Sequence, residues 1–224
     1  MLCTLSEDLM AYRTWKDHLC LRVAFCAVAI FACNGTALAE CKREVGARCQ
    51  SAQLINVTWR KADLSGGNFR DANLEGANLE GARLRGADLR GANLKFARLE
   101  RTDLAEADLD GANLTGANLR NANLSRARLA GAQLPKSFLE GADLSYARLS
   151  GTDLTRSNMV GADLQHGDMS GALLDGSVLN YCNLKQANLT GASIQRVRLI
   201  GARLNEAVWI DGRVCHSTSV GKCD

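Results

Sequence analysis

Histidine, proline and aromatic residues are scarce in this chain of 224 residues, and their scarcity argues against several classes of function. The sequence has three His and one Pro, and aromatic residues make up 5%. After residue 39 the histidines are His166 and His216, and no Ser-His-Asp set, phosphate-binding loop or metal cluster is apparent. We therefore expect no catalysis, no metal and no cofactor. Few outward aromatics, and Arg and Lys interspersed with Asp and Glu, argue against nucleic-acid binding.

The sequence also lacks a long hydrophobic run. Its most apolar stretch, Val23–Ala32, is shorter than the roughly 20 residues that cross a bilayer, so we expect no integral membrane anchor. A segment with basic residues, Tyr12–His18, precedes this stretch, and Ala37-Leu38-Ala39 follows it. This order is typical of a secretory signal peptide cleaved after residue 39, with Met10 as an alternative start. We expect a bacterial protein that is periplasmic or secreted.

The cysteines support export. Four of the five beyond residue 39 form two pairs of equal spacing: Cys41 with Cys49, and Cys215 with Cys223. In an exported chain such pairs predict disulfides, which would secure both ends. A zinc site on the same cysteines is less favoured, because the nearest histidine is His216, beside one pair only. The alternative to secretion is a lipoprotein anchored through Cys33, although Phe31 fits poorly in the pattern expected before a lipidated Cys.

A five-residue period dominates the rest of the sequence. Every fifth residue from Leu54 to Trp209 is apolar, and 26 of these 32 residues are Leu. The residue two places before each is Ala in 22 cases, and Cys182 in the same position is expected to be a small core residue. The residue two places after is Gly in 15 cases, which favours a turn. A fixed period of this kind indicates a repeat architecture.

This period excludes both a helix and a flat strand. A helix turns by about 500° over five residues, so the Leu residues would drift around it. A strand would point successive Leu residues to opposite faces, because five is an odd number. The chain must bend between one Ala–Leu pair and the next, which predicts coils of short extended segments with Ala and Leu inside. We expect Pro135 to break a ladder hydrogen bond and make its coil irregular.

The units Ala72-Asn73-Leu74, Ala87-Asp88-Leu89 and Ala162-Asp163-Leu164 resemble those of the pentapeptide-repeat family. The resemblance implies an all-β fold, a right-handed quadrilateral parallel β-helix with four repeats to a coil. The 32 repeats would then make about eight coils and a rod of roughly 38 Å. The recurrence of Gly every 20 residues, from Gly91 to Gly191, agrees with four repeats per coil.

We predict four segments along the chain. They are a signal peptide at 1–39, an N-terminal cap at 40–51, the pentapeptide-repeat β-helix at 52–211 and a C-terminal disulfide cap at 212–224. Large inward residues replace Leu near the ends of the repeats, at Trp59, Phe69 and Trp209. We interpret these three as plugs over the core, because the ends of a repeat array have no neighbouring coil.

Outward positions on later coils form a candidate interaction surface. With four repeats per coil, one face carries apolar residues, and Leu173 lies on an adjoining side; the face comprises Phe138, Val160, Val178, Tyr181 and Ile200. Exposed apolar clusters mark interaction sites. Ordinary scatter, or a C-terminal extension that covers these residues, explains them equally well.

A column of Asp residues on another face suggests paired carboxylates or a calcium site. The column contains Asp63, Asp103, Asp143 and Asp163, but Arg83 and Arg203 stand in the same column and would repel a cation. Asp and Asn at this position are instead expected to suit the backbone of the repeat. We predict no metal site there.

Family resemblance also raises a second function, that of a DNA mimic that modulates a topoisomerase such as gyrase. A rod that replaces duplex DNA needs dense negative charge, whereas this chain has a net charge of +3. Export would also place it in the wrong compartment. We therefore predict a non-enzymatic structural or protein-interaction module, whose partner is an unknown protein or a second copy of the chain.

Overall fold

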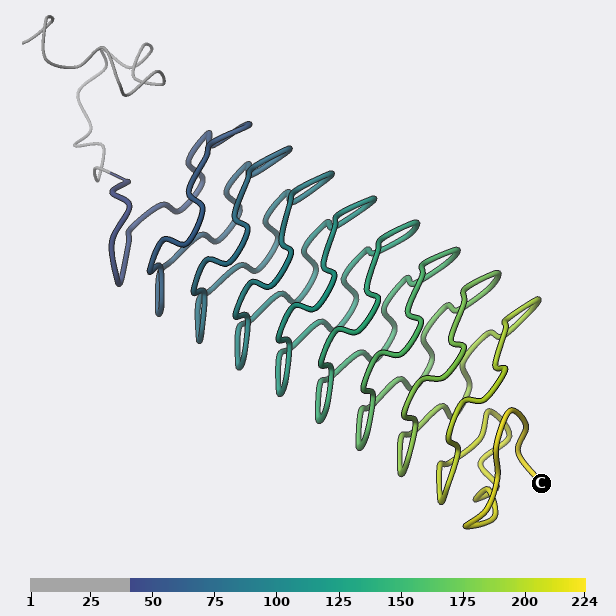
Figure 1. Ribbon diagram of the computed structural model, residues 1–224. Helices are drawn as coiled ribbons and strands as arrows, with labels where there is room; N and C mark the ends of the chain where they lie inside the picture. The colour runs from purple at the N-terminus through teal and green to yellow at the C-terminus, as the bar shows by residue number, and fades with distance from the viewer. Residues whose placement is uncertain (1–40) are drawn as a thin grey trace, which may run out of the picture. The chain divides into compact units, whose positions relative to one another are not determined.

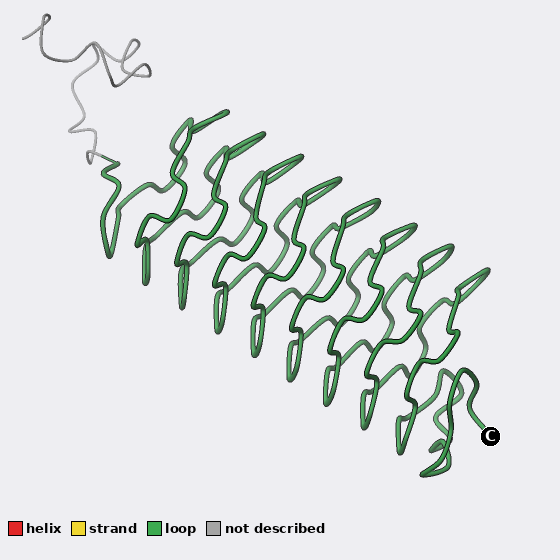
Figure 2. Cartoon of the chain, in the orientation of Figure 1, coloured by secondary structure: helices red, strands yellow, loops and turns green. Residues whose placement is uncertain are grey.

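The computed structural model describes residues 41–224, which form a solenoid of stacked coils (Figure 1). These residues contain no α-helix and no continuous strand (Figure 2). Isolated β-bridges hold the coils together. The predicted leader and Cys33 lie outside the described residues. Within 41–224, no helix is long and apolar enough to cross a membrane.

Each repeat contributes one bridging residue, which lies between the inward Ala and the inward Leu. The bridges within the repeats are parallel and join residues 20 apart, as in the series Asn73, Asn93 and Asn113. Twenty residues hold four repeats, so one coil is four repeats long. Three residues of each repeat are extended and two form a turn. The extended part is too short for a continuous strand, which is why the coils carry single bridges where the all-β prediction would place strands.

Asp and Asn are common at the bridging position because their side chains close the following turn. The Asn113 Oδ1 accepts a hydrogen bond from the Thr115 backbone N–H at 3.1 Å. Asp63 accepts hydrogen bonds from both the hydroxyl and the backbone N–H of Ser65, which lower the pKa of its carboxyl group. This local role, and not a cation site, accounts for the Asp column.

The second turn residue of every repeat is in the left-handed region. From Ser51 to Glu206, the φ angles at this position lie between 53° and 70°. Seventeen residues other than Gly adopt this conformation in the described chain, although it costs an L-residue roughly 1–2 kcal/mol. Stacking of the coils therefore imposes the turn, and Gly is favoured at this position without being required.

Ala and Leu fill the interior, and most of them are at most 1% exposed. Small polar residues that replace Ala donate to a backbone carbonyl, as Thr102 Oγ1 does to Leu79 O at 2.9 Å. Cys182 is fully buried, and its thiol donates to Met159 O at 2.8 Å. Burial raises the pKa of this thiol to about 12. Ser177 is the exception among the described buried hydroxyls, because its Oγ has no partner.

Pro135 does not disturb its coil, which corrects our expectation of an irregularity. It occupies the first turn position, whose backbone N–H takes no part in the ladder between coils. Its carbonyl accepts the Gly116 N–H at 3.0 Å, and the Lys136 N–H donates to Thr155 O at 2.9 Å, as in other coils. Proline is tolerated here because the donor that it lacks is not needed.

The repeat geometry begins at Ala47, one unit before the predicted boundary at residue 52. Arg48 already forms a parallel bridge 20 residues ahead, and Ala47 is buried. Cys49 stands in the Leu position and is buried, and it is disulfide-bonded to Cys41 with an S–S distance of 1.99 Å. The sequence pattern did not reveal this unit because a half-cystine takes the place of Leu.

Two aromatic rings occupy inward positions near the N-terminal end. Phe69 is 1% exposed, whereas Trp59 is half-buried, and the two rings meet edge to face with their centroids 6.4 Å apart. Gly67 makes room for the larger ring, because a Cβ there would lie 2.5 Å from Phe69 Cε2.

At the C-terminal end the chain reverses direction after Trp209, which is 8% exposed. Antiparallel bridges join Val208 to Val214 and Arg203 to Val220, so residues 213–221 lie across part of the last coil. We call residues 213–221 the tail.

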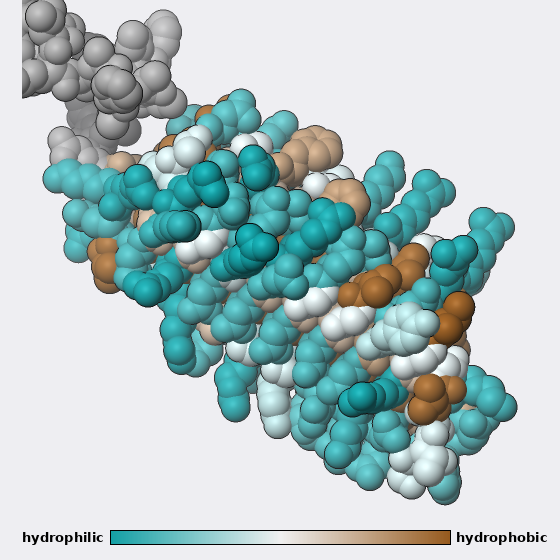
Figure 3. All heavy atoms as spheres, in the orientation of Figure 1, coloured by the Kyte–Doolittle hydropathy of each residue, from teal (hydrophilic) through white to brown (hydrophobic). Residues whose placement is uncertain are grey.

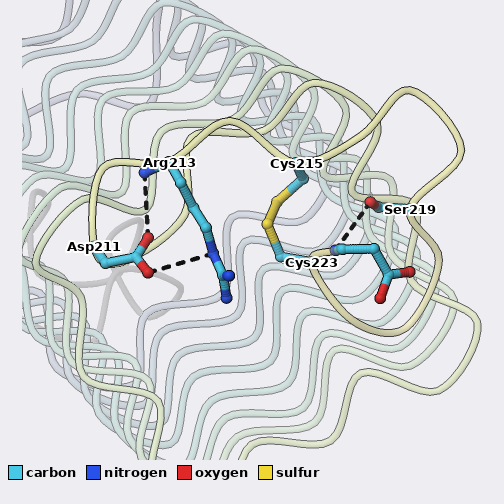
Figure 4. Close-up of a disulfide and its surroundings, with 6 residues drawn as sticks. Asp211, Arg213, Cys215, Ser219 and Cys223 are labelled. Carbon is cyan, nitrogen blue, oxygen red and sulfur yellow. Dashed lines mark hydrogen bonds and ion pairs between the residues drawn. A yellow bond between two sulfur atoms is a disulfide. The ribbon is translucent and has the colours of Figure 1, made fainter.

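A disulfide and local polar contacts hold the tail (Figure 4). Cys215 and Cys223 are bonded with an S–S distance of 2.09 Å. Arg213 Nε lies 3.3 Å from Asp211 Oδ2 (Figure 4), and Ser219 Oγ accepts the Asp224 backbone N–H at 3.3 Å.

Candidate interaction surface

One face of the solenoid changes its chemistry along the rod. We define the lateral face by two columns of outward residues. One column runs from Thr58 to Arg198 and the other from Arg60 to Ile200, and each contains every twentieth residue, one from each coil. In its first part, acidic side chains alternate with Arg and Asn. Asn118 Nδ2 donates to Glu100 Oε1 at 2.7 Å.

This polar ladder continues as far as Glu140. Arg120 Nη2 lies 3.0 Å from Glu140 Oε1, and Asn158 Nδ2 donates to the same oxygen at 2.8 Å. The pattern joins side chains 18 and 20 residues apart, which are neighbours on adjacent coils. Side chains at equivalent spacings on later coils are therefore neighbours too.

Beyond Glu140, three of the six positions of the lateral face are apolar, namely Val160, Val178 and Ile200, and the other three are Asn158, Asn180 and Arg198. Val178 bridges Asn158 and lies 18 residues after Val160, the spacing at which Asn158 meets Glu140. Ile200 and Tyr181 are 64% and 66% exposed, and the Tyr181 N–H donates to Ile200 O at 2.8 Å. We call Val160, Val178, Tyr181 and Ile200 the apolar cluster. Figure 3 shows hydrophobic side chains gathered toward the C-terminal end of the visible face.

The other two predicted surface residues lie apart from this cluster. Phe138 is 39% exposed, and the Arg120 guanidinium covers its ring at 4.5 Å from the ring centroid. Leu173 is 45% exposed and bridges Asp153, so it lies on a different side of the coil. Phe138 is therefore partly shielded by a charged neighbour, and Leu173 forms a separate apolar point.

Two exposed aromatic residues were not in our prediction, Phe96 and Tyr146. Both occupy the left-handed turn position at the corners of coils, and they are 62% and 49% exposed. The Tyr146 ring stacks on His166 with centroids 4.6 Å apart, and Arg126 lies over its other side at 5.0 Å. The 20-residue spacing of Arg126, Tyr146 and His166 was a signal that could have revealed this stack.

Beside this stack lies a shallow hollow of about 470 Å³. It is lined by Asp110, Arg128, Ala130, Tyr146, Ala147, Arg148, Ser150, His166 and Asp168. Arg128 pairs with Asp110, which raises the pKa of the guanidinium, and Asp168 accepts hydrogen bonds from Ser170 and Asn188. His166 contacts Gln165 at 3.1 Å, not a carboxylate or a hydroxyl. This arrangement does not resemble a nucleophile with its base.

The described residues contain no group of three or more His, Cys, Asp or Glu placed to hold a metal ion. In the Asp column, Asp63 lies beside Arg83 at 3.5 Å. Asp103 and Asp163 each accept a hydrogen bond from an Asn side chain one coil away at 3.0 Å. These three carboxylates are thus engaged with cationic and amide groups of their own column.

Comparisons with solved structures place the chain among proteins with the same repeat. It is 37% identical to HetL, a pentapeptide repeat protein involved in heterocyst differentiation regulation from the cyanobacterium Nostoc sp. strain PCC 7120, over 76% of this chain and 86% of that one, with a TM-score of 0.31. It is 35% identical to a pentapeptide repeat protein from the Arabidopsis thaliana thylakoid lumen, over 47% of this chain and 67% of that one, with a TM-score of 0.36.

A third solved structure supports the fold. QnrB1, a plasmid-mediated fluoroquinolone resistance protein, is 18% identical over 71% of this chain and 86% of its own, with a TM-score of 0.56. No significant match is found among curated protein sequences. The family model for pentapeptide repeats matches in eight copies, in segments that lie between residues 47 and 205. Proteins of this kind form right-handed, four-sided β-helices. The chain therefore belongs to the pentapeptide-repeat family.

Proposed function

We propose that the chain is an exported, non-enzymatic module that binds another protein through its apolar cluster. Its scaffold would be a right-handed four-sided β-helix of about eight coils. The observation that carries this proposal is the grouping of Val160, Val178 and Ile200 on a face that carries only polar and charged residues in its first coils. Apolar residues gathered on one part of a polar surface are typical of protein interfaces.

Export is the second part of the proposal. It is supported by the leader pattern at residues 1–39 and by disulfides near both ends of the solenoid, which are typical of oxidising compartments. The protein would be periplasmic or secreted, with Cys33 as the anchor if it is lipidated.

Fractionation of the native host, followed by intact mass measurement with and without reductant, tests export. We expect a chain that begins at Glu40 and gains four hydrogens on reduction, two for each of its two disulfides. A lipid-modified chain that begins at Cys33 would replace secretion by anchoring. An uncleaved, fully reduced chain in the cytosol would contradict export.

Site-specific photocrosslinking tests the surface. A photoreactive residue at position 178 should give a protein adduct of defined mass in the native host, and Ile200→Asp should reduce its yield at least fivefold. The same residue at position 96 is the control, because Phe96 is 62% exposed and lies outside the cluster. An adduct of twice the protomer mass would identify a second copy as the partner. Equal yields from both positions, or no adduct from either, would overturn the proposal.

A further inference from the structure

The C-terminal end of the solenoid is covered on only half of its last coil. The tail pairs with residues 202–209 through Leu204 N to Ser219 O, at 2.9 Å, and through Cys215 N to Ala207 O, at 2.8 Å. Within the described chain, no segment pairs with the preceding half of that coil. We call residues 192–199 the open edge.

The ladder of the preceding coil shows which groups of the open edge lack partners. One coil earlier, the N–H groups of Leu174, Gly176 and Leu179 donate to the next coil at 2.7–2.8 Å. Twenty residues later, the corresponding N–H groups of Ile194, Arg196 and Leu199 have no acceptor among the described residues. The carbonyls of Ala192 and Val197 likewise lack the donors that their counterparts one coil earlier have, the N–H groups of Ser193 and Arg198.

The core is also uncovered here. Ile194, Val197 and Leu199 point inward but are only half-buried, whereas Leu179 and Leu184 on the preceding coil are fully buried. Ile200, at the border between the open edge and the apolar cluster, is 64% exposed. An unpaired row of backbone donors and acceptors beside apolar side chains is a template for an added strand.

The tail supplies a precedent for such an addition. It pairs with the other half of the same coil through two short extended pieces on either side of a turn at residues 217–218, and it uses the same kinds of backbone groups, at Ala202 O, Leu204 N and Ala207 O. Strand addition of this kind gains affinity from main-chain hydrogen bonds and specificity from alternate side chains.

The charges of the open edge select the added segment. Arg196 and Arg198 are exposed and have no carboxylate partner among the described residues. A second copy paired edge to edge would bring four guanidinium groups together, which is unfavourable. An acidic segment would be attracted to them.

We propose that the open edge binds an acidic polypeptide segment, with apolar residues at the inward spacing of the repeat, as an added layer on the last coil. Its apolar side chains cover Ile194, Val197 and Leu199, and its carboxylates pair with Arg196 and Arg198. This inference deepens the proposed function, because it names how one class of protein segment is bound at the end of the module.

The test uses the full mature chain and a capped synthetic peptide of about eight residues, with Val at the positions that match 192, 194, 197 and 199, Gly at the turn and Glu elsewhere. Binding is measured by fluorescence anisotropy, and hydrogen exchange reports protection of residues 192–199. We expect saturable binding that slows exchange in this segment. Reversing both charges, with Arg196→Glu and Arg198→Glu, should weaken binding at least tenfold and should produce binding of the matching Lys–Val peptide. Both positions are exposed, so the fold is retained.

Two controls separate strand addition from simple charge attraction. A peptide with N-methylated backbone amides keeps the charges but loses donors, and it should not bind. A variant with Arg203→Glu, which reverses an exposed Arg outside the open edge, should bind the acidic peptide as the unmodified chain does.

Equal binding of the methylated peptide, absence of binding, or a dimer that alone protects residues 192–199 would each overturn the proposal. Any of these results could coexist with crosslinking from position 178, so failure of strand addition is distinguishable from failure of the proposed function.

Discussion

Two glycines in consecutive repeats allow the energetic effect of one contact between adjacent coils to be measured. Gly111 and Gly116 occupy the same turn position, with φ of 67° and 66°. A Cβ at Gly111 would meet nothing within 4 Å, whereas a Cβ at Gly116 would lie 2.8 Å from two ring atoms of Phe96. Replacing each by Ala therefore imposes the same backbone cost but a different side-chain cost.

The expected magnitudes follow from this geometry. Gly111→Ala should lower the free energy of unfolding by about 1 kcal/mol, the cost of an L-residue in the left-handed region. Gly116→Ala should cost the same plus about 1 kcal/mol, because the Phe96 ring must leave the surface that it covers. Phe96 is exposed and can swing outward, which limits the second cost.

Urea denaturation followed by circular dichroism measures both variants. In a Phe96→Ala background, the excess cost of Gly116→Ala should disappear, and its effect should equal that of Gly111→Ala. If both glycine variants lowered the free energy of unfolding equally in the original background, the contact between position 116 and the Phe96 ring would be refuted. An excess that persists without Phe96 would show that another neighbour causes it.

Three further predictions concern the core and the tail. Removing the second disulfide by Cys215→Ser with Cys223→Ser should lower the local free energy of opening of the tail by about 2.5 kcal/mol; hydrogen exchange measures this, and unchanged protection would contradict it. Ser177→Ala should raise the free energy of unfolding by about 1 kcal/mol, because an unpaired buried hydroxyl is removed. Ser157→Ala should lower it by a similar amount, because Ser157 donates to a backbone carbonyl at 2.7 Å. Urea denaturation that showed the same sign for both variants would contradict this reasoning. The Cys182 thiol, whose pKa is raised to about 12, should resist iodoacetamide at pH 8 until the protein unfolds, and rapid labelling of the native chain would contradict its burial. The stability that this buried thiol contributes should be full below pH 9 and lost as the pH rises toward 12.

The five-residue period was sufficient to predict coils of short extended segments, and the family resemblance supplied the number of four repeats per coil. The positions of Ala and Leu predicted the buried residues, and the Gly residues at 20-residue intervals agreed with the register that the bridges show. That register also placed Val160 and Val178 on one face. These successes share a cause, because each depends only on position within a strictly periodic backbone.

Other features could not be predicted from the period. The left-handed turn is imposed on residues such as Phe96 and Tyr146 by stacking of the coils, so their identity gave no sign of it. The effect of Pro135 depended on which N–H groups join the ladder. The tail carries no repeat, so its antiparallel course and the half-covered coil end followed only from tertiary pairing.

The 20-residue register gives every outward residue two independent coordinates, a side of the coil and a height along the axis. Deleting a whole coil would shorten the rod and leave each downstream residue on its original side. Deleting one five-residue unit would turn everything downstream by one side, which would carry Val178 and Ile200 away from the face that holds Glu140. Length changes in steps of four repeats therefore preserve the surface pattern of this protein, whereas changes in steps of one repeat would scramble it while leaving the Ala and Leu core intact.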